Sequence, residues 1–155
     1  MNQNEQVIFN FYTAFQNLDA ETMVSHYTDS IIFEDPGFGE IRGEDAKNMW
    51  RMLCKNAQDL NITFSITGSK GDKVTAHWDA EYTFSRTGRF VKNSIDATFT
   101  LENGKITDHR DHFNLWKWSQ QALGTSGLLL GWSPFFRKKL HESTGLMLQK
   151  FGSKG

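Results

Sequence analysis

The spacing of apolar residues changes near residue 60, and that change constrains the fold more than any other feature. Before residue 60, apolar side chains recur every three or four positions, which predicts helices over 4–17 and 43–56 and a shorter helix after Asp19. From Ile62 onward they alternate with polar residues, which is typical of strands. Helices followed by an antiparallel meander indicate an α+β fold, with the helices on one face of the sheet.

Turn signals divide the second part of the chain into strands. Asn103-Gly104 is a strong hairpin signal, and Thr87-Gly88 marks another turn. The strands that we expect lie over 31–34, 62–66, 74–86, 90–102 and 105–118. We expect residues 1–120 to form one domain. Residues 121–155 are interrupted by glycines, and we expect them to form a helical extension packed on the same domain or on a dimer partner.

The composition narrows the classes of function. The formal net charge is −1, which gives no global attraction to nucleic acid or to an anionic membrane. The single cysteine, Cys54, allows neither an internal disulfide nor a cysteine zinc cluster. The first residues, MNQNEQ, lack the basic start and apolar run of a signal peptide, and no stretch approaches the ~20 apolar residues of a membrane span. We therefore expect a cytoplasmic protein.

Basic residues gather at the C-terminal end. From residue 137 onward the chain has five basic residues and one acid, so residues 1–136 hold 12 basic and 17 acidic residues. The acidic part is where we expect a site. Residues 135–151 are predicted to form a basic amphipathic helix, whose aromatic start suits contact with a membrane surface or a lipid-like ligand. Packing of this helix over the domain or a dimer partner is the alternative.

Alternation along the strands assigns carboxylates to defined faces. In the stretch SIIFEDPGFGEIRG, Asp35 shares a face with Phe33, whereas Glu34 lies on the other. The other polar candidates on strands are His77, Asp79, Asp96, His109 and Asp111. Two interpretations are open. One face of an open antiparallel sheet is often solvated, which would make such residues ordinary surface. Alternatively, a carboxylate at the mouth of an apolar pocket has a pKa suited to proton transfer. The spacing lacks a metal-binding signature, so we expect neither a metal ion nor an organic cofactor.

Three motifs together resemble a known superfamily. The N-terminal helices, the sequence FEDP at 33–36 and the ending LENGKITDHRDHFNLWKW at 101–118 are similar to those of NTF2-like, or SnoaL-like, proteins. The resemblance extends over about residues 4–120, judged on the pattern of apolar residues. It implies a cone in which a curved antiparallel sheet encloses a pocket closed by helices, and a homodimer formed through the sheet. The side chains that it places at the pocket are Trp50, Phe33, Phe113 and His109.

Within this superfamily, three positions resemble the bacterial ketosteroid isomerases. The resemblance implies that Asp35 is the general base and that Tyr12 and a protonated Asp96 hydrogen-bond the oxygen that gains charge. The chain departs from that pattern at Lys92, which shares a face with Asp96 and would favour its ionised form.

The second half also resembles limonene-epoxide hydrolase. The sequence Arg110-Asp111-His112-Phe113 matches the closing segment of that family, and Asp79 falls near its second catalytic aspartate. The bridging arginine is replaced here by His77, which can act as an acid–base relay between two aspartates.

Three hypotheses for function therefore remain. The chain is a cofactor-free proton-transfer isomerase, a hydrolase that uses Asp and His, or a protein that binds a ligand or a lipid without catalysis. In each case the expected partner is a small, largely apolar molecule bearing a carbonyl or hydroxyl group, not a nucleic acid. Besides the homodimer, we expect weak membrane contact through the basic C-terminal helix.

Overall fold

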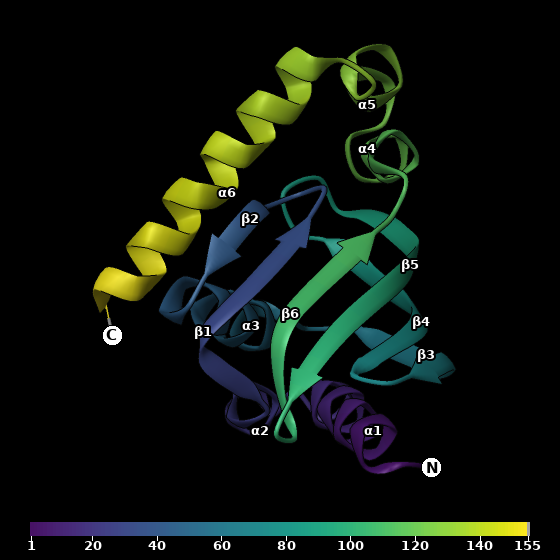
Figure 1. Cartoon of the computed structure of the whole chain (residues 1–155). Helices are drawn as coiled ribbons and strands as arrows, with labels where there is room; N and C mark the ends of the chain where they lie inside the picture. The colour runs from purple at the N-terminus through teal and green to yellow at the C-terminus, as the bar shows by residue number, and fades with distance from the viewer. Residues whose placement is uncertain (155) are drawn as a thin grey trace.

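The computed structural model describes residues 1–154, in which helices pack on a curved six-stranded sheet (Figure 1). The strand order is β2-β1-β6-β5-β4-β3. The α+β cone expected from the sequence is confirmed. The elements are α1 (Gln3–Gln16), α2 (Ala20–Ser25), β1 (Tyr27–Asp35), β2 (Gly39–Arg42), α3 (Glu44–Asn56), β3 (Asn61–Lys70), β4 (Lys73–Phe84), β5 (Arg89–Glu102), β6 (Lys105–His112), α4 (Leu115–Leu123), α5 (Thr125–Leu130) and α6 (Pro134–Lys154).

Side-chain caps begin the first two helices, and the cap at Asp19 is the one that the sequence predicted. The Asn2 side chain accepts a hydrogen bond from the Glu5 backbone N–H at 2.8 Å, and the Glu5 carboxylate accepts one from the Asn2 backbone N–H at 3.4 Å. Asp19 accepts from the Thr22 backbone N–H at 3.1 Å and so starts α2. Each cap satisfies backbone donors that have no partner inside the helix.

The four strands β3 to β6 form the predicted meander. The β5–β6 turn has positive φ at both Asn103 and Gly104, which a two-residue hairpin of this type requires. Two features were not predicted. β1 begins at Tyr27 instead of residue 31 and pairs in parallel with β6, and the short strand β2 extends the sheet beyond β1.

The expectation that the last strand runs to Trp118 is wrong. β6 ends at His112, and α4 begins at Leu115. The Asn114 side chain accepts a hydrogen bond from the Lys117 backbone N–H at 3.0 Å, which caps α4. The apolar residues of this segment therefore follow a helical period, and Leu115 is buried in the described structure. α4 also crosses residue 120, where we expected the domain to end.

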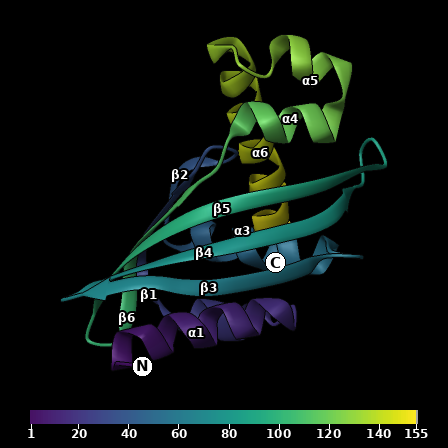
Figure 2. The ribbon, with the colours of Figure 1, turned by 90° about the vertical axis from the view of Figure 1, so that its right-hand side faces the viewer.

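The core fills the concave side of the sheet. α1 packs on β3 and β4, and α3 packs on β1 and β2, so that inward side chains of the strands meet two helices (Figure 2). Aromatic rings occupy most of this space. The largest fully buried side chains include Trp50, Tyr12, Phe11, Phe33 and Phe99.

The C-terminal segment returns to the domain. α4 packs on β5, α5 packs on α4, and α6 runs back along α3 (Figure 1). Leu148 of α6 joins the main core, and the Lys55 ammonium lies 5.8 Å from the centre of the Phe151 ring. Among residues 1–154 no helix has the length and apolarity needed to cross a membrane.

Candidate active site

A chain of hydrogen bonds lies inside the cone. The Trp50 Nε1–H donates to the Tyr27 hydroxyl oxygen at 2.8 Å, and that hydroxyl lies 2.7 Å from His109 Nδ1. His109 Nε2 lies 2.9 Å from Asp111 Oδ1. His109 and Asp111 are 0% and 3% exposed, so the chain is shielded from solvent. The four residues come from α3, β1 and β6, which meet at the centre of the core.

The direction of each bond in this chain follows from its first donor. An indole N–H can only donate, so the Tyr27 oxygen accepts from Trp50 and the Tyr27 hydrogen is directed to His109 Nδ1. The hydrogen of a neutral imidazole then lies on Nε2 and donates to Asp111. Burial raises the pKa of Tyr27 well above its ordinary value, which keeps its hydroxyl protonated. The arrangement satisfies every member and fixes the position of the Asp111 carboxyl.

A second carboxyl, Asp35, lies beside Asp111. β1 and β6 pair in parallel, with Phe33 opposite His109 and Glu34 opposite Arg110. One residue further along these strands lie Asp35 and Asp111, and neighbouring strands are about 4.8 Å apart. Side chains alternate along a strand, so Asp35 and Asp111 are on the same inward face as Phe33 and His109, two residues before them.

The environment of Asp35 favours a protonated carboxyl. Its pKa is raised from 3.8 to about 7, mainly by burial and in addition by the charge of Asp111, while a hydrogen bond from the Phe38 backbone N–H at 2.6 Å opposes the shift. A group with such a pKa exchanges protons readily near neutral pH.

α6 holds the turn that carries Asp35. His141 Nε2 donates to the Pro36 carbonyl at 2.8 Å, and the Thr144 hydroxyl donates to the Gly37 carbonyl at 3.1 Å. Gly39 has a φ of +74°, and a Cβ at this position would lie 3.2 Å from the His141 ring. The C-terminal extension therefore fixes the backbone on which the Asp35 carboxyl is mounted.

Tyr82 on β4 is a member of the site that the sequence analysis missed. Its hydroxyl accepts from Trp118 Nε1 at 2.8 Å, which leaves its own hydrogen for another acceptor. Burial raises the pKa of Tyr82, and the nearby Asp35 charge adds to the shift. The signal in the sequence was alternation, since Trp78, Ala80 and Tyr82 share the inward face of β4.

The predicted pocket residues divide into two groups. Phe33, Trp50 and His109 are buried and fill the deep part of the cone, whereas Phe113 is only partly buried and packs against the edge of the core. At the deep end, the Tyr12 hydroxyl and the Trp78 indole N–H are buried without a hydrogen-bond partner among residues 1–154. Burial raises the pKa of Tyr12 well above its ordinary value.

The remaining predicted residues form a separate cluster on the outer face of the sheet. His77 Nδ1 lies 2.8 Å from Asp96 Oδ1, and His77 Nε2 lies 3.3 Å from Asp79 Oδ1. The Ser94 hydroxyl donates to the same Asp79 oxygen at 2.5 Å. The Asp96 side chain is 79% exposed.

Neither predicted catalytic set converges. Asp96 lies on the opposite face of the sheet from Asp35 and Tyr12, and His77 and Asp79 lie on the opposite face from Asp111. The pleat of the sheet directs successive side chains to opposite faces. Asp96 points to the outer face, where it is hydrogen-bonded to His77 of β4.

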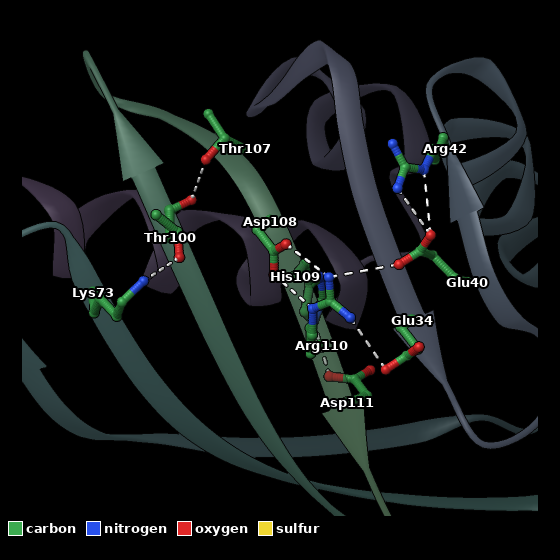
Figure 3. Close-up of polar contacts among 10 residues, drawn as sticks. All are labelled: Glu34, Glu40, Arg42, Lys73, Thr100, Thr107, Asp108, His109, Arg110 and Asp111. Carbon is green, nitrogen blue, oxygen red and sulfur yellow. Dashed lines mark hydrogen bonds and ion pairs between the residues drawn. The ribbon is translucent and has the colours of Figure 1, made fainter.

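Arg110 also points outward, as Figure 3 shows. Its guanidinium binds Asp108 at 3.0 Å and Glu34 at 3.2 Å, and lies 3.6 Å from Glu40, so it links β6 to β1 and β2. Arg110 is therefore a surface ion-pair residue instead of a neighbour of the inward carboxyls. Within residues 1–154 no three His, Cys, Asp or Glu side chains are grouped so that they would hold a metal ion.

The sequence pattern of the SnoaL-like domain matches residues 8–109, which is more than half of the chain. The chain belongs to the SnoaL-like family. Solved structures agree with this assignment. An NTF2-like protein of unknown function from Burkholderia pseudomallei is 17% identical, with a TM-score of 0.68 and coverage of 79% of this chain and 99% of that one.

Two further structural neighbours are enzymes or enzyme-like proteins. An LEH-like epoxide hydrolase from M. tuberculosis is 22% identical, with a TM-score of 0.61 over 83% of this chain and 91% of that one. SalBIII, an epoxide hydrolase/cyclase-like enzyme in pyran ring formation, is 20% identical, with a TM-score of 0.63 over 72% and 91%. At these identities the neighbours show the SnoaL-like fold and leave the chemistry to the residues of this chain.

Proposed function

We propose that this chain is a cofactor-free enzyme that transfers protons on a small, largely apolar molecule bearing a carbonyl or hydroxyl group. The observation that carries the proposal is the pair of inward carboxyls, Asp35 and Asp111, on neighbouring strands. One is fixed by a buried hydrogen-bond chain, and the other is partly buried with a pKa of about 7. Two carboxyls in one apolar site provide an acid and a base at the same pH.

The roles of the residues follow from their protonation. An ionised Asp35 takes a proton from a carbon next to a carbonyl, and the protonated carboxyl returns it to another atom of the same molecule. The free hydrogen of the Tyr82 hydroxyl donates to the oxygen that gains charge. Asp111, positioned by His109, stabilises the protonated form of Asp35. In this proposal Tyr82, instead of Asp96, is the hydrogen-bond donor beside the general base Asp35.

The walls of the cone support an apolar substrate that carries oxygen. The side chains buried in the core beside the carboxyls are mostly aromatic, so a ligand that reaches the carboxyls must be largely apolar. The Tyr12 hydroxyl and Trp78 N–H, which have no hydrogen-bond partner among the described residues, are donors, and a buried donor gains stability from an acceptor such as a carbonyl or hydroxyl oxygen.

Hydrolysis of an epoxide is the second candidate, and the same carboxyl pair supports it. A protonated Asp35 donates to the epoxide oxygen while the Asp111 carboxylate takes a proton from water, which attacks carbon and yields a diol. The epoxide hydrolase and the epoxide hydrolase/cyclase-like enzyme among the structural neighbours make this class worth testing.

The test measures uptake of deuterium from D₂O at the carbons beside the carbonyl of small cyclic ketones, followed by proton NMR. A parallel set of styrene oxide reactions is assayed for the diol. We expect Asp35→Asn to lower the rate by about 10²–10⁴, the usual contribution of a general base, and Tyr82→Phe by about 10²–10³. Broadening of the ligand's proton NMR lines measures ligand binding to the same variants.

Asp96→Asn is the matched control, because it removes a carboxyl from the outer face. Its rates are expected to equal those of the wild type. If Asp96→Asn abolished turnover while Asp35→Asn did not, the outer cluster would be the catalytic one. If ligands bound wild type and Asp35→Asn equally and were released chemically unchanged, the protein would be a binding protein instead of an enzyme.

A further inference from the structure

The corner between α5 and α6 exposes its large residues and buries its small ones. Gly127 and Gly131 are buried against α4, where a Cβ on either would collide with Ser119. The leucines between these glycines are therefore turned away from the protein. The exposed apolar residues of this corner are Leu128, Leu129, Leu130, Trp132 and Phe135.

This apolar corner exposes several large side chains to solvent. Trp132 and Phe135 are 66% and 68% exposed. The Trp132 indole N–H donates to the Leu129 carbonyl at 2.9 Å, so the ring is held in place beside the leucines. Contiguous exposed apolar groups of this kind mark interaction sites, because burying them releases hydration free energy.

Positive charge borders the corner. Arg137, Lys138 and Lys139 follow directly on α6 and are exposed. The Lys139 ammonium lies 5.6 Å from the centre of the Phe135 ring and 3.9 Å from a carboxylate oxygen of Glu142. Beyond Phe113 the chain has six basic residues and Glu142 as its single acid; the basic residues are Lys117, Arg137, Lys138, Lys139, Lys150 and Lys154.

We propose that this corner, residues 128–139, docks on an anionic lipid surface. Leucine and aromatic side chains enter the boundary between headgroups and acyl chains, and the adjacent cations pair with phosphate and carboxylate headgroups. Tryptophan suits this position, because its ring is apolar and its N–H is polar. Docking is independent of the proton-transfer chemistry and places the end of the molecule formed by α4, α5 and the start of α6 against the lipid (Figure 1).

Charge favours a lipid over a symmetric dimer formed through this corner. In such a dimer each copy would have to place carboxylates against Arg137–Lys139 of the other, whereas α4 to α6 hold Glu142 as their single acid. Pairing of two such corners would bring like charges together, which is unfavourable. An anionic headgroup layer supplies both the apolar and the negative component.

Co-sedimentation of the full chain with vesicles tests the docking. Vesicles of pure phosphatidylcholine are compared with vesicles of equal parts phosphatidylcholine and phosphatidylserine, at low and high salt. We expect binding to the anionic vesicles that salt weakens. Lys138→Ala with Lys139→Ala lowers affinity by about 25-fold, at about fivefold per charge. Trp132→Ser with Phe135→Ser lowers it by at least about tenfold.

Phe9→Ser is the control, because Phe9 is a partly exposed aromatic residue of α1 at the other end of the molecule (Figure 1). It is expected to bind vesicles as the wild type does, and thermal melting checks that each variant is folded. Equal sedimentation with neutral and anionic vesicles, or none with either, would overturn the proposal. Self-association in solution that Trp132→Ser abolishes, without vesicle binding, would assign the corner to a second copy.

Discussion

The sheet has two His-x-Asp pairs, one on each face. His77 and Asp79 lie on the outer face of β4, and His109 and Asp111 lie on the inner face of β6. Both histidines contact two polar partners, but His109 is fully buried, whereas the side chain of His77 is 36% exposed. The same spacing thus produces a solvated ion cluster in one place and a buried hydrogen-bond chain in the other. The burial of a His-x-Asp pair, and not its sequence, therefore decides what its side chains can do.

The largest difference is expected when each histidine is replaced by alanine. His109→Ala leaves the Asp111 carboxylate buried and unpaired and removes the partner of Tyr27, so we expect a loss of about 3–5 kcal/mol in the free energy of unfolding. His77→Ala removes an exposed pair and is expected to cost about 1 kcal/mol or less. Urea unfolding of the two variants measures both values. Equal losses would mean that burial does not separate the two clusters.

The second prediction concerns Asp35 and pH. The unfolded chain has an Asp pKa near 3.8, and the folded value is about 7. Between these values the folded protein binds a proton that the unfolded chain has released. The stabilising contribution is therefore complete below pH 3.8 and is lost as the pH rises through 7, at about 1.4 kcal/mol per pH unit. Asp35→Asn keeps the acceptor for Phe38 and lacks this slope, so parallel unfolding curves of the two proteins between pH 5 and 7 would contradict the prediction.

Two tyrosines of the core provide a smaller, matched contrast. Tyr27→Phe leaves the Trp50 N–H and the His109 ring nitrogen without their partner, which we expect to cost about 1–3 kcal/mol. Tyr12→Phe removes a hydroxyl that has no partner within residues 1–154, so stability is expected to stay unchanged or rise by up to about 1 kcal/mol. Thermal or urea unfolding of both variants checks this order, and a larger loss for Tyr12→Phe would reverse it.

The smallest effect is expected at the outer cluster. Hydrogen bonding to Asp96 and Asp79 raises the pKa of His77, while partial desolvation opposes the shift. A raised folded value means that the contribution is present below pH 6.5 and is lost as the pH rises through the folded pKa. It is expected to be at most about 1 kcal/mol and to weaken with salt. His77→Asn, melted at pH 5.5 and 8 in low and high salt, measures it; a loss that salt leaves unchanged would count against an exposed pair.

Much of this arrangement follows from the sequence. Alternation correctly separated Asp35 from Glu34 and placed His109 and Asp111 on the face of β6 opposite Arg110. The caps Asn2 and Asp19 and the Asn103-Gly104 turn are local signals, so the elements around them were predictable.

The rest depends on contacts between distant segments. Alternation assigns residues to two faces but does not say which face is concave. The carboxyls of the inner and the outer face were therefore equally good candidates for the site. The parallel pairing of β1 with β6 joins residues about 76 positions apart, and only that pairing sets Asp35 beside Asp111. Tyr82 became a candidate through its contact with Trp118, in a helix that the sequence pattern had assigned to a strand.

The central claim is that Asp35, buried and next to the Asp111 carboxyl, exchanges a proton near neutral pH. Carbon-13 NMR titration of the aspartate carboxyls, in wild type and in Asp111→Asn, measures this directly. We predict a pKa of about 7 for Asp35 in the wild type and a lower value in the variant, because the charge of Asp111 is removed. A wild-type value near 3.8, or one that Asp111→Asn leaves unchanged, would contradict the account.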